Sequence, residues 1–461
     1  MSAPDLETLR HSLSRGALVT DRDKIEPYRR DSTMAKDLGH PIAVVRARST
    51  QDVQRTMQWC GSHRVPIVPR GAGTGLAGGA VAVDGGVVLS LENLDSIRVD
   101  TTTQTATVGP GVLNGDLKAA VREHGLWYPP DPSSFRISTI GGNIATNAGG
   151  LCCVQDGVTR DYVLGLEVVL ADGEVITLGG ELRKDVAGLA LLQLFIGSEG
   201  ILGIVTGATL RLTRPPAPTT TFAATFHDME SAAHAVIDVR RESRPSLLEL
   251  MDDVAIGAVE DHRQSGLDRS ARCLLLVQVE QATGALEHVE SILISAGAKD
   301  VYATQDRDEG EQFIEARRLV LPAAECLGSL LLEDIAVPLS KLPHMCRTID
   351  EIRERTQMMI PVVAHAGDGN LHPMIVHDRT DPDSCRRAQQ AFDEILAAAI
   401  ALGGTITGEH GVGRTKRAAL PTQLGERVMQ LTADVKRTFD PDGILNPGAV
   451  IDTDWSPHKR R

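Results

Sequence analysis

The stretch VPIVPRGAGTGLAGGAVAVDGGVVLS, residues 65–90, places a glycine-rich segment between two short apolar runs. Gly73, Gly75 and Gly78 match the G-x-G-x-x-G pattern of dinucleotide-binding folds, in which a helix begins inside the pattern. That helix would cover residues 75–86, where five of the twelve residues are glycine. At about 1 kcal/mol for each glycine relative to alanine, the helix is disfavoured by roughly 5 kcal/mol. The segment is therefore predicted to be a loop between two strands.

Such a loop can still bind phosphate, because successive backbone N–H groups form an anion site that no side chain obstructs. Arg70, at the start of the loop, can add positive charge. Two further glycine-rich clusters follow in the same β-rich region, YPPDPSSFRISTIGGNIATNAGG at 128–150 and FIGSEGILGIVTGA at 195–208. Small residues and amides at this density predict three loops that contact a large cofactor with a ring system and phosphates.

Composition limits the class of protein. The 461 residues suffice for two or three domains, and the net charge of −14 argues against nucleic acid as the main partner. The seven cysteines have no C-x-x-C spacing, which is typical of reduced thiols in a cytosolic protein. No apolar run reaches the roughly 18–20 residues that span a bilayer, so we expect no transmembrane segment. The opening MSAPDLETLRHSL predicts a capped amphipathic helix rather than a signal peptide.

The pattern of elements changes once along the chain. Residues 40–214 are rich in short β-type runs, including a hairpin around Asp172-Gly173. The stiff connector RPPAP at 214–218 ends this region. Strand-like and helix-like runs then alternate, which predicts an α+β domain with a sheet covered by helices. From about residue 420 a helical piece leads into a turn-rich segment.

Two short segments carry metal-ligand chemistry. HAGDGNLH at 365–372 has a strong turn sequence between two strand-like runs, so its two histidines should lie at the same end of a sheet. GGTITGEHGVGRTK at 403–416 places Glu409 and His410 between glycines. Two imidazoles and a carboxylate form a facial set for Zn²⁺, Fe²⁺ or Mn²⁺. The alternative is a pair of hydrogen-bonded structural histidines, because His-x6-His is not a standard metal spacing.

The glycine-rich motifs PRGAGTGLAGGA, PPDPSS, STIGGNIATNAGG and GSEGILGIVTGATLRL occur in an order that resembles the vanillyl-alcohol-oxidase-type flavoproteins over about residues 40–214. The resemblance implies FAD, with the first loop around its pyrophosphate. Some members carry FAD covalently on a loop histidine, but this loop has Thr74, so non-covalent FAD is expected. The residues that the resemblance places on FAD are Arg70, Gly71, Ala72, Gly73, Thr74, Gly75, Gly78, Gly79, Pro130, Asp131, Ser138, Thr139, Gly141, Gly142, Asn143, Thr146, Asn147, Gly149, Gly150, Glu199, Gly200, Gly203, Ile204, Val205 and Asn446.

The motifs HAGDGNLH and GEHGVGRTK, with DIAVPLSKL and FDPDGILNPG, resemble the FAD-linked D-2-hydroxyacid dehydrogenases. That group includes D-lactate and D-2-hydroxyglutarate dehydrogenases and the flavin subunit of glycolate oxidase. The resemblance implies a divalent metal on His365, His372 and Glu409, with Zn²⁺ favoured over Mn²⁺ or Fe²⁺, and His410 as the catalytic base. It also makes Arg317 the partner of the substrate carboxylate, although a solvated helical face remains the alternative for this residue.

The reaction implied is oxidation of a D-2-hydroxy acid, D-lactate or D-2-hydroxyglutarate, to the 2-oxo acid. A hydride would pass from Cα to flavin N5 while His410 takes the hydroxyl proton; a carbanion route would use the same residues. Electrons would continue to an electron-transfer flavoprotein, a quinone or a cytochrome. The alternatives are an FAD oxidase that uses O₂ and a non-catalytic flavin electron-transfer subunit.

The expected fold is α+β with four parts. An N-terminal helical segment covers 1–39, a two-part FAD-binding domain 40–214, and a substrate- and metal-binding domain 219–415. The last domain should contain an antiparallel sheet covered by helices, and the C-terminal helical segment 416–461 should return to the FAD domain. We expect a cytoplasmic protein, free or peripheral to the membrane, and the resemblance is compatible with a homodimer.

Overall fold

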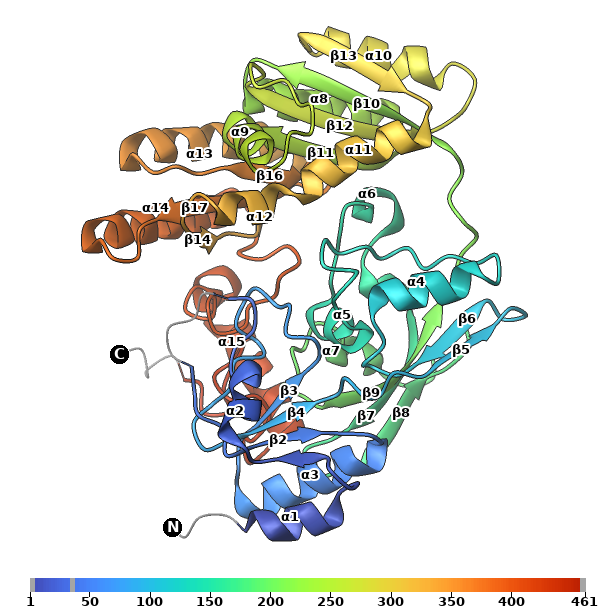
Figure 1. Cartoon of the computed structure of the whole chain (residues 1–461), viewed down its shortest axis with the longest axis vertical. Coiled ribbons are helices and arrows are strands. Elements are labelled where there is room, and N and C mark those ends of the chain that lie inside the picture. Colours follow the sequence, from blue (N-terminus) through green and yellow to red (C-terminus); the bar gives the residue numbers. More distant parts are fainter. Residues whose placement is uncertain (1–4, 34–37, 457–461) are drawn as a thin grey trace. The chain divides into compact units, whose positions relative to one another are not determined.

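The structure, a computed structural model, describes residues 5–33 and 38–456 (Figure 1). The chain divides into two compact units. Unit 1 contains residues 1–148, 158–215 and 409–461, and unit 2 contains residues 149–157 and 216–408. The chain leaves unit 1 after Pro215 and enters unit 2 at Pro216, within the expected connector at 214–218. Two stretches are grouped differently from the expected domains: 149–157 belongs to unit 2, and 409–415 belongs to unit 1.

Unit 1 begins with a four-stranded sheet in the order β1-β2-β4-β3, with β1 at Leu18–Val19, β2 at Ala43–Arg46, β3 at Ile67–Arg70 and β4 at Val87–Ser90. Strand β4 pairs in parallel with both β2 and β3. Helix α3 (Thr50–His63) connects β2 to β3 and begins at Ser49, whose side chain accepts a hydrogen bond from the Asp52 N–H. No helix forms between β3 and β4, which confirms the predicted glycine loop.

The second sheet of unit 1 is antiparallel and has the order β5-β6-β9-β7-β8. Its strands are β5 Ile97–Asp100, β6 Thr105–Val108, β7 Val163–Val169, β8 Val175–Gly179 and β9 Ile204–Arg211. The β7–β8 pair is the hairpin predicted from Asp172-Gly173. Gly173 has a φ of 85°, a conformation that favours glycine in this turn.

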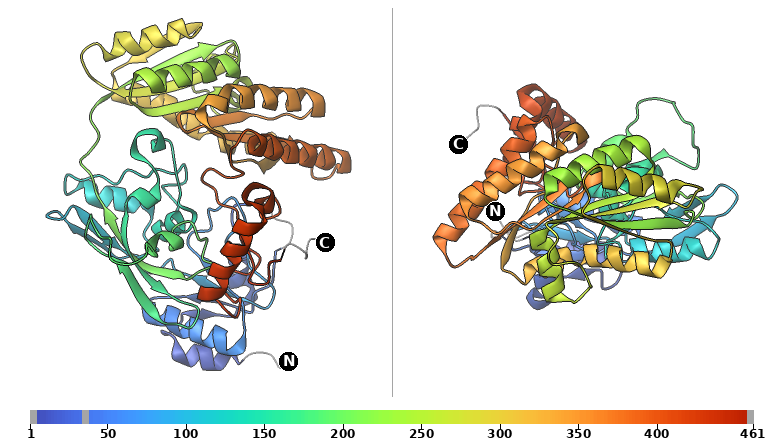
Figure 2. Two further views of the ribbon diagram at one scale, coloured as in Figure 1. Left: turned by 180° about the vertical axis from the view of Figure 1, so that it is seen from behind. Right: turned by 90° about the horizontal axis from the view of Figure 1, so that it is seen from above.

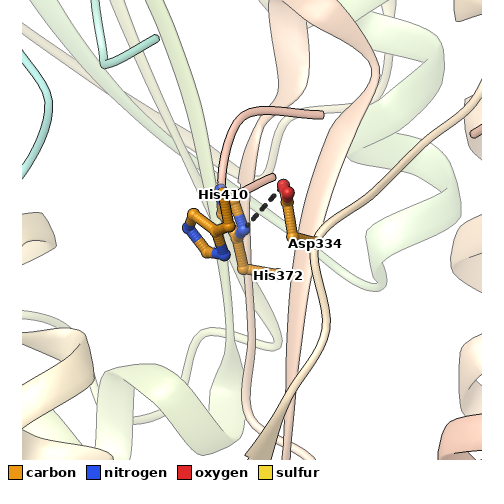
Figure 3. Close-up of side chains that lie close together, drawn as sticks. All are labelled: Asp334, His372 and His410. Atoms are coloured by element: carbon orange, nitrogen blue, oxygen red, sulfur yellow. Dashed lines mark ion pairs between the residues drawn. The ribbon is translucent and has the colours of Figure 1, made fainter. Parts of the chain in front are cut away.

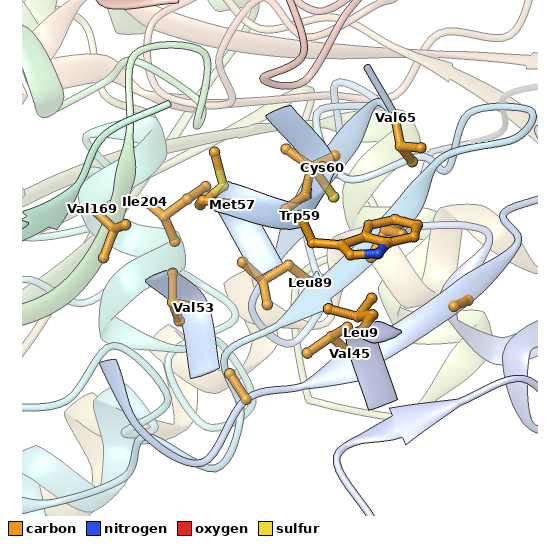
Figure 4. Packing of buried hydrophobic residues seen from close by; sticks show 14 of the residues in the cluster. Leu9, Val45, Val53, Met57, Trp59, Cys60, Val65, Leu89, Val169 and Ile204 are labelled. Carbon is orange, nitrogen blue, oxygen red and sulfur yellow. The ribbon is translucent and has the colours of Figure 1, made fainter. Parts of the chain in front are cut away.

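One apolar core joins the two sheets of unit 1 (Figure 4). It includes Val53 and Met57 from α3, Val169 from β7 and Ile204 from β9. The C-terminal stretch enters the same core after α15 (Leu420–Phe439), which is kinked at Gly425. The backbone N–H of Ile67 donates to Ile444 O at 2.8 Å, and the N–H of Asn446 donates to Ile67 O at 2.8 Å. The predicted return of the C-terminal segment is thereby confirmed.

The shorter helices of unit 1 are α1 Leu6–Ser12, α2 Arg22–Ile25, η1 Glu26–Tyr28, α4 Asn114–Arg122, α5 Ile140–Thr146, η2 Thr159–Asp161 and α7 Leu192–Phe195. Helix α5 differs from the expected glycine-rich loop. The Thr139 side chain accepts a hydrogen bond from the Gly142 N–H, and Asn147 ends the helix in the left-handed conformation. These two caps offset the low helix propensity of the glycine pair inside the helix.

Unit 2 contains one antiparallel sheet in the order β13-β10-β12-β11-β16-β17-β14, with β15 also paired to β17. This confirms the predicted antiparallel sheet. The strands are β10 Thr219–Phe226, β11 Pro245–Asp252, β12 Cys273–Glu280, β13 Asp300–Thr304, β14 Ser329–Leu332, β15 Ile335–Ala336, β16 Val362–His365 and β17 Asn370–His377.

Helices cover both faces of this sheet (Figure 2). On one face lie α8 Met229–Glu242, α10 Ala285–Ser295, α13 Leu342–Thr356 and α14 Pro382–Ala401, and on the other lie α9 Asp253–His262, α11 Arg307–Arg318 and α12 Val320–Glu325. The side chains of Leu247, Met251 and Val363 pack with α9, α11 and α12 in one buried cluster. Because side chains alternate along a strand, other odd-numbered residues of β11 and β16 face the same helices.

The inserted stretch 149–157 forms helix α6 (Cys153–Asp156), which packs near β11. Arg240 Nη1 donates to Val154 O at 3.0 Å and holds this stretch in unit 2. The seven cysteines of the chain are all free thiols. Within residues 5–33 and 38–456, no helix combines the length and the apolar character needed to cross a membrane.

Candidate active site

The glycine loop of unit 1 meets the start of α5. A Cβ atom on Gly71 would lie 2.2 Å from Thr139 Oγ1, so a side chain at position 71 would collide with the residue that caps α5. Gly73 and Gly78 have φ values of 75° and 79°, which favour glycine. The glycines of the loop therefore allow its backbone to approach α5 closely. We call the space between Gly71 and Thr139 the Gly71 cradle, because a side chain at position 71 would fill it.

The third glycine cluster and the C-terminal segment reach the same loop. Asn446 Nδ2 donates to Gly79 O and to Glu199 O, each at 2.8 Å. The Glu199 carboxylate accepts hydrogen bonds from the Val412 N–H at 2.7 Å and the Gly413 N–H at 2.9 Å. Burial raises the pKa of Glu199 to about 7, although these two backbone donors lower it. The predicted residues Gly79, Glu199 and Asn446 are thus brought together.

A buried amide links part of the middle cluster. Asn114 Nδ2 donates to Pro130 O at 3.2 Å and to Asn143 Oδ1 at 3.0 Å. Asn143 Nδ2 in turn donates to Ser138 Oγ at 3.2 Å. Three residues that the sequence places on FAD are therefore held in fixed positions by Asn114, which the sequence reasoning did not identify.

Other residues predicted to contact FAD have different surroundings. Gly149 and Gly150 are grouped with unit 2. The Ile204 side chain lies in the core, so only its backbone could face a cofactor. Arg70 Nη1 donates to Arg30 O at 2.6 Å, and its guanidinium lies 5.8 Å from the centre of the Tyr28 ring. The loop backbone, α5 and the 199–200 turn fit a large phosphate-bearing cofactor, while the individual FAD contacts remain predictions.

The two histidines of the 365–372 motif lie on neighbouring strands of unit 2. His365 ends β16, and His372 lies in β17, opposite Val363 in the antiparallel register. Their ring centroids are 5.1 Å apart with an angle of 84° between the rings, and both side chains are buried. The turn between the strands, formed by η4 (Ala366–Asp368) and Gly369, brings the imidazoles together as the sequence predicts.

Each histidine faces a buried carboxylate through Nδ1. His365 Nδ1 lies 2.8 Å from Glu249 Oε1, its neighbour across the β11–β16 pair. His372 Nδ1 lies 3.6 Å from Asp334 Oδ1, an ion-pair contact drawn in Figure 3. For His365, the carboxylate at hydrogen-bond distance from Nδ1 orients the ring and leaves Nε2 as the nitrogen that faces away, as in carboxylate–histidine–metal arrangements.

Asp334 also holds the backbone that leads to Glu409. Its Oδ2 accepts hydrogen bonds from Thr407 Oγ1 at 2.6 Å and from the Gly408 N–H at 3.0 Å. Its Oδ1 accepts a hydrogen bond from Asn370 Nδ2 at 2.9 Å.

Two groups of side chains have the atoms and spacing of a metal site. His365, His372 and Glu409 offer ligand atoms within 4.8 Å of one another, and so do Asp334, His372 and His410. Figure 3 shows the second group. The oxygens of Asp334 already accept hydrogen bonds from Asn370 and the 407–408 segment. The first group is the one that the resemblance assigns to a divalent metal, and that assignment remains a prediction.

Arg317 is buried rather than solvated. Its side chain on α11 is 6% exposed, and Nε lies 2.9 Å from Glu249 Oε2. This contradicts the alternative that Arg317 belongs to a solvated helical face. The neighbouring Arg318 is partly buried and forms ion pairs with Glu311 and Glu315.

Sequence reasoning missed Glu249 and Asp334 as functional candidates. The signal was present for both, because each is an acidic residue inside an apolar run, SLLELM at 246–251 and LLEDIAV at 331–337. A carboxylate in such a run is costly to bury unless it is paired. Their partners, however, are set by strand pairing across distant segments.

Comparison with known proteins identifies the family. A family model described as "FAD binding domain" matches residues 41–179, and one described as "FAD linked oxidases, C-terminal domain" matches residues 215–450. The glycolate oxidase subunit GlcD of Bacillus subtilis is 44% identical over 421 residues, covering 90% of this chain and 90% of that protein. The D-lactate dehydrogenase of Archaeoglobus fulgidus is 35% identical over 437 residues, covering 92% of this chain and 96% of that protein.

A solved structure of p-cresol methylhydroxylase with bound substrate shares the fold, with a TM-score of 0.80 at 18% identity over 98% of this chain and 97% of that one. This likeness confirms the predicted fold class. The two family matches cover both halves of the chain, and the relatives align over nearly its full length. The chain therefore belongs to the family of FAD-linked 2-hydroxyacid dehydrogenases.

Proposed function

We propose that this FAD-dependent oxidoreductase converts a short 2-hydroxy acid, D-lactate or glycolate, to the corresponding 2-oxo acid with the help of a divalent metal. The observation that carries the proposal is the pair of buried imidazoles of His365 and His372, whose ligand atoms lie within 4.8 Å of each other and of a Glu409 oxygen. Glycolate and D-lactate are the compounds in the names of two relatives that align with nearly the whole chain.

The substrate carboxylate is assigned to Arg317. Glu249 contacts the Nε side of the guanidinium, so the two Nη groups are the donors that remain for a bidentate pair with a carboxylate. Such a pair fixes the orientation of the acid. It also accounts for a substrate class that carries a carboxylate next to the carbon to be oxidised.

The substrate hydroxyl is assigned to His410. A histidine titrates near neutrality, so a neutral His410 can accept the hydroxyl proton as the C–H bond breaks. A divalent metal on His365, His372 and Glu409 would supply Lewis acidity that lowers the pKa of that hydroxyl. FAD, when bound by unit 1, supplies the two-electron acceptor for the hydrogen that leaves Cα.

A substrate panel with one variant tests this proposal. Purified protein is mixed anaerobically with D- and L-lactate, glycolate and D-2-hydroxyglutarate while the flavin absorbance is followed. Wild-type protein should bleach with a short 2-hydroxy acid, and His410→Ala should keep its flavin but reduce it at least 100-fold more slowly, the low end of a general base's contribution of about 10²–10⁴. Normal reduction in His410→Ala would contradict the assignment of the base. Bleaching by none of the acids would contradict the reaction class.

A further inference from the structure

Glu249 holds a metal-ligand candidate and an arginine at the same time. It lies in β11 directly opposite His365 of β16, on the sheet face covered by α9, α11 and α12. One carboxylate oxygen, Oε1, lies 2.8 Å from His365 Nδ1, and the other, Oε2, lies 2.9 Å from Arg317 Nε. The two partners contact different oxygens of the same carboxylate, so a rotation of that group changes both contacts.

Stability alone does not account for this arrangement. The Glu249 and Arg317 side chains are 1% and 6% exposed. Removing two charges from water costs several kcal/mol for each ion, and apolar residues of the same volume often serve the fold equally well. The carboxylate is therefore better explained by what it orients than by what it contributes to the core.

Each contact of the Glu249 carboxylate affects the orientation of its partner, His365 or Arg317. A carboxylate acceptor on Nδ1 selects the tautomer that carries its proton there, so that Nε2 is the nitrogen available to ligate. The same carboxylate pairs with the Nε side of the guanidinium and so restrains where the two Nη groups lie. Both the metal ligand and the substrate-binding group would thus be oriented by a single side chain.

We propose that Glu249 is a positioning residue that couples metal binding at His365 to carboxylate binding at Arg317. This inference rests on the proposed function, because it assigns Glu249 to the same site. It predicts that one substitution weakens two separate properties, the affinity for a divalent cation and the affinity for the hydroxy acid, without loss of FAD.

The test compares two FAD-loaded proteins, the wild type and Glu249→Gln. Both are first stripped of metal with a chelator. Mn²⁺ binding is measured by electron paramagnetic resonance, which needs no turnover, and KM and kcat are then measured with the preferred acid. Glutamine keeps the size of the side chain but places an amide NH₂ against one of its two partners. The expected result is a 10–100-fold loss of Mn²⁺ affinity, together with a raised KM and unchanged flavin content.

Asp252→Asn is the matched control. Asp252 is a buried carboxylate of the same strand, three residues along, where it pairs with Arg353 of α13 and accepts the capping hydrogen bond from the Ala255 N–H of α9. Its substitution should lower the unfolding temperature but leave Mn²⁺ affinity and KM unchanged. Equal losses in the two variants would mean that any buried carboxylate of β11 has this effect, and would overturn the proposal.

A double-mutant cycle separates coupling from two independent effects. If Glu249 acts on KM through Arg317, adding Glu249→Gln to Arg317→Met should raise KM little beyond Arg317→Met alone. Full additivity would overturn the proposal.

The outcomes for the proposed function and for the coupling can be told apart. A wild-type protein that binds Mn²⁺ but oxidises no hydroxy acid contradicts the proposed function, while the Mn²⁺ loss in Glu249→Gln would still test the coupling. Normal oxidation with no change in Glu249→Gln contradicts the coupling alone.

Discussion

At the scale of single residues, the buried carboxyl groups of Glu249 and Glu199 have different surroundings and therefore different properties. Glu249 contacts an arginine and a histidine, and the charge of Arg317 compensates that of the carboxylate inside unit 2. Glu199 in unit 1 is surrounded mainly by backbone, with N–H donors from Val412 and Gly413. Because burial outweighs these donors, the pKa of Glu199 rises from 4.5 to about 7. The neutral acid and the carboxylate of Glu199 are therefore both populated in the folded protein near neutral pH.

This shift makes a pH-dependent contribution to stability. The folded-state pKa lies above the unfolded value, so the contribution is fully present below about pH 4.5 and is lost as pH rises through about 7. The slope can reach about 1.4 kcal/mol per pH unit in that window. In Glu199→Gln the group no longer titrates, so the unfolding free energy should vary less between pH 5 and 8 than in the wild type. Parallel pH profiles of thermal unfolding for the two proteins would contradict the assignment.

At the scale of elements, the sequence predicts the loops and turns whose structure depends on their own residues and immediate neighbours. The loop 71–86 lacks a helix because its glycines disfavour one, and the turn at 366–369 places His365 and His372 together because two strand-like runs flank it. Helix α5 was not predictable in this way, since tertiary contacts and its two caps override its glycine content. Glu249 and His365 are 116 residues apart, so their contact depends on the β11–β16 register. That register cannot be read from either strand alone.

The glycine loop provides a test of the cradle. In Gly71→Ala the added Cβ would lie 2.2 Å from Thr139 Oγ1, so either the loop moves or α5 loses its cap, which costs about 1 kcal/mol. We expect the purified variant to fold but to retain much less FAD, measured by the ratio of flavin to protein absorbance. Gly180→Ala is the matched control, because a Cβ there meets nothing within 4 Å. Equal flavin content in the two variants would show that the Gly71 cradle does not hold the cofactor.

At the scale of the whole molecule, each unit is built from segments that are separated in the sequence. Residues 149–157 leave unit 1 for unit 2 and return, and the chain goes back to unit 1 at Glu409. Motif order predicted an FAD-binding fold, an α+β part with an antiparallel sheet, and the return of the C-terminal segment. They did not give the short excursion at 149–157, because Arg240, which holds it, is distant in the sequence. The expected domain end at residue 415 likewise followed a motif, whereas the compact unit ends at Gly408.

Metal removal is the measurement that bears most directly on the central claim, that His365, His372 and Glu409 hold a cation needed for 2-hydroxy acid oxidation. The FAD-loaded protein is treated with a chelator, desalted and mixed anaerobically with the preferred acid, with and without added Zn²⁺ or Mn²⁺. The expected result is retained flavin, loss of flavin reduction by the acid, and recovery on adding metal in the wild type but not in His372→Ala. Full-rate reduction by protein shown to be free of metal would contradict the claim.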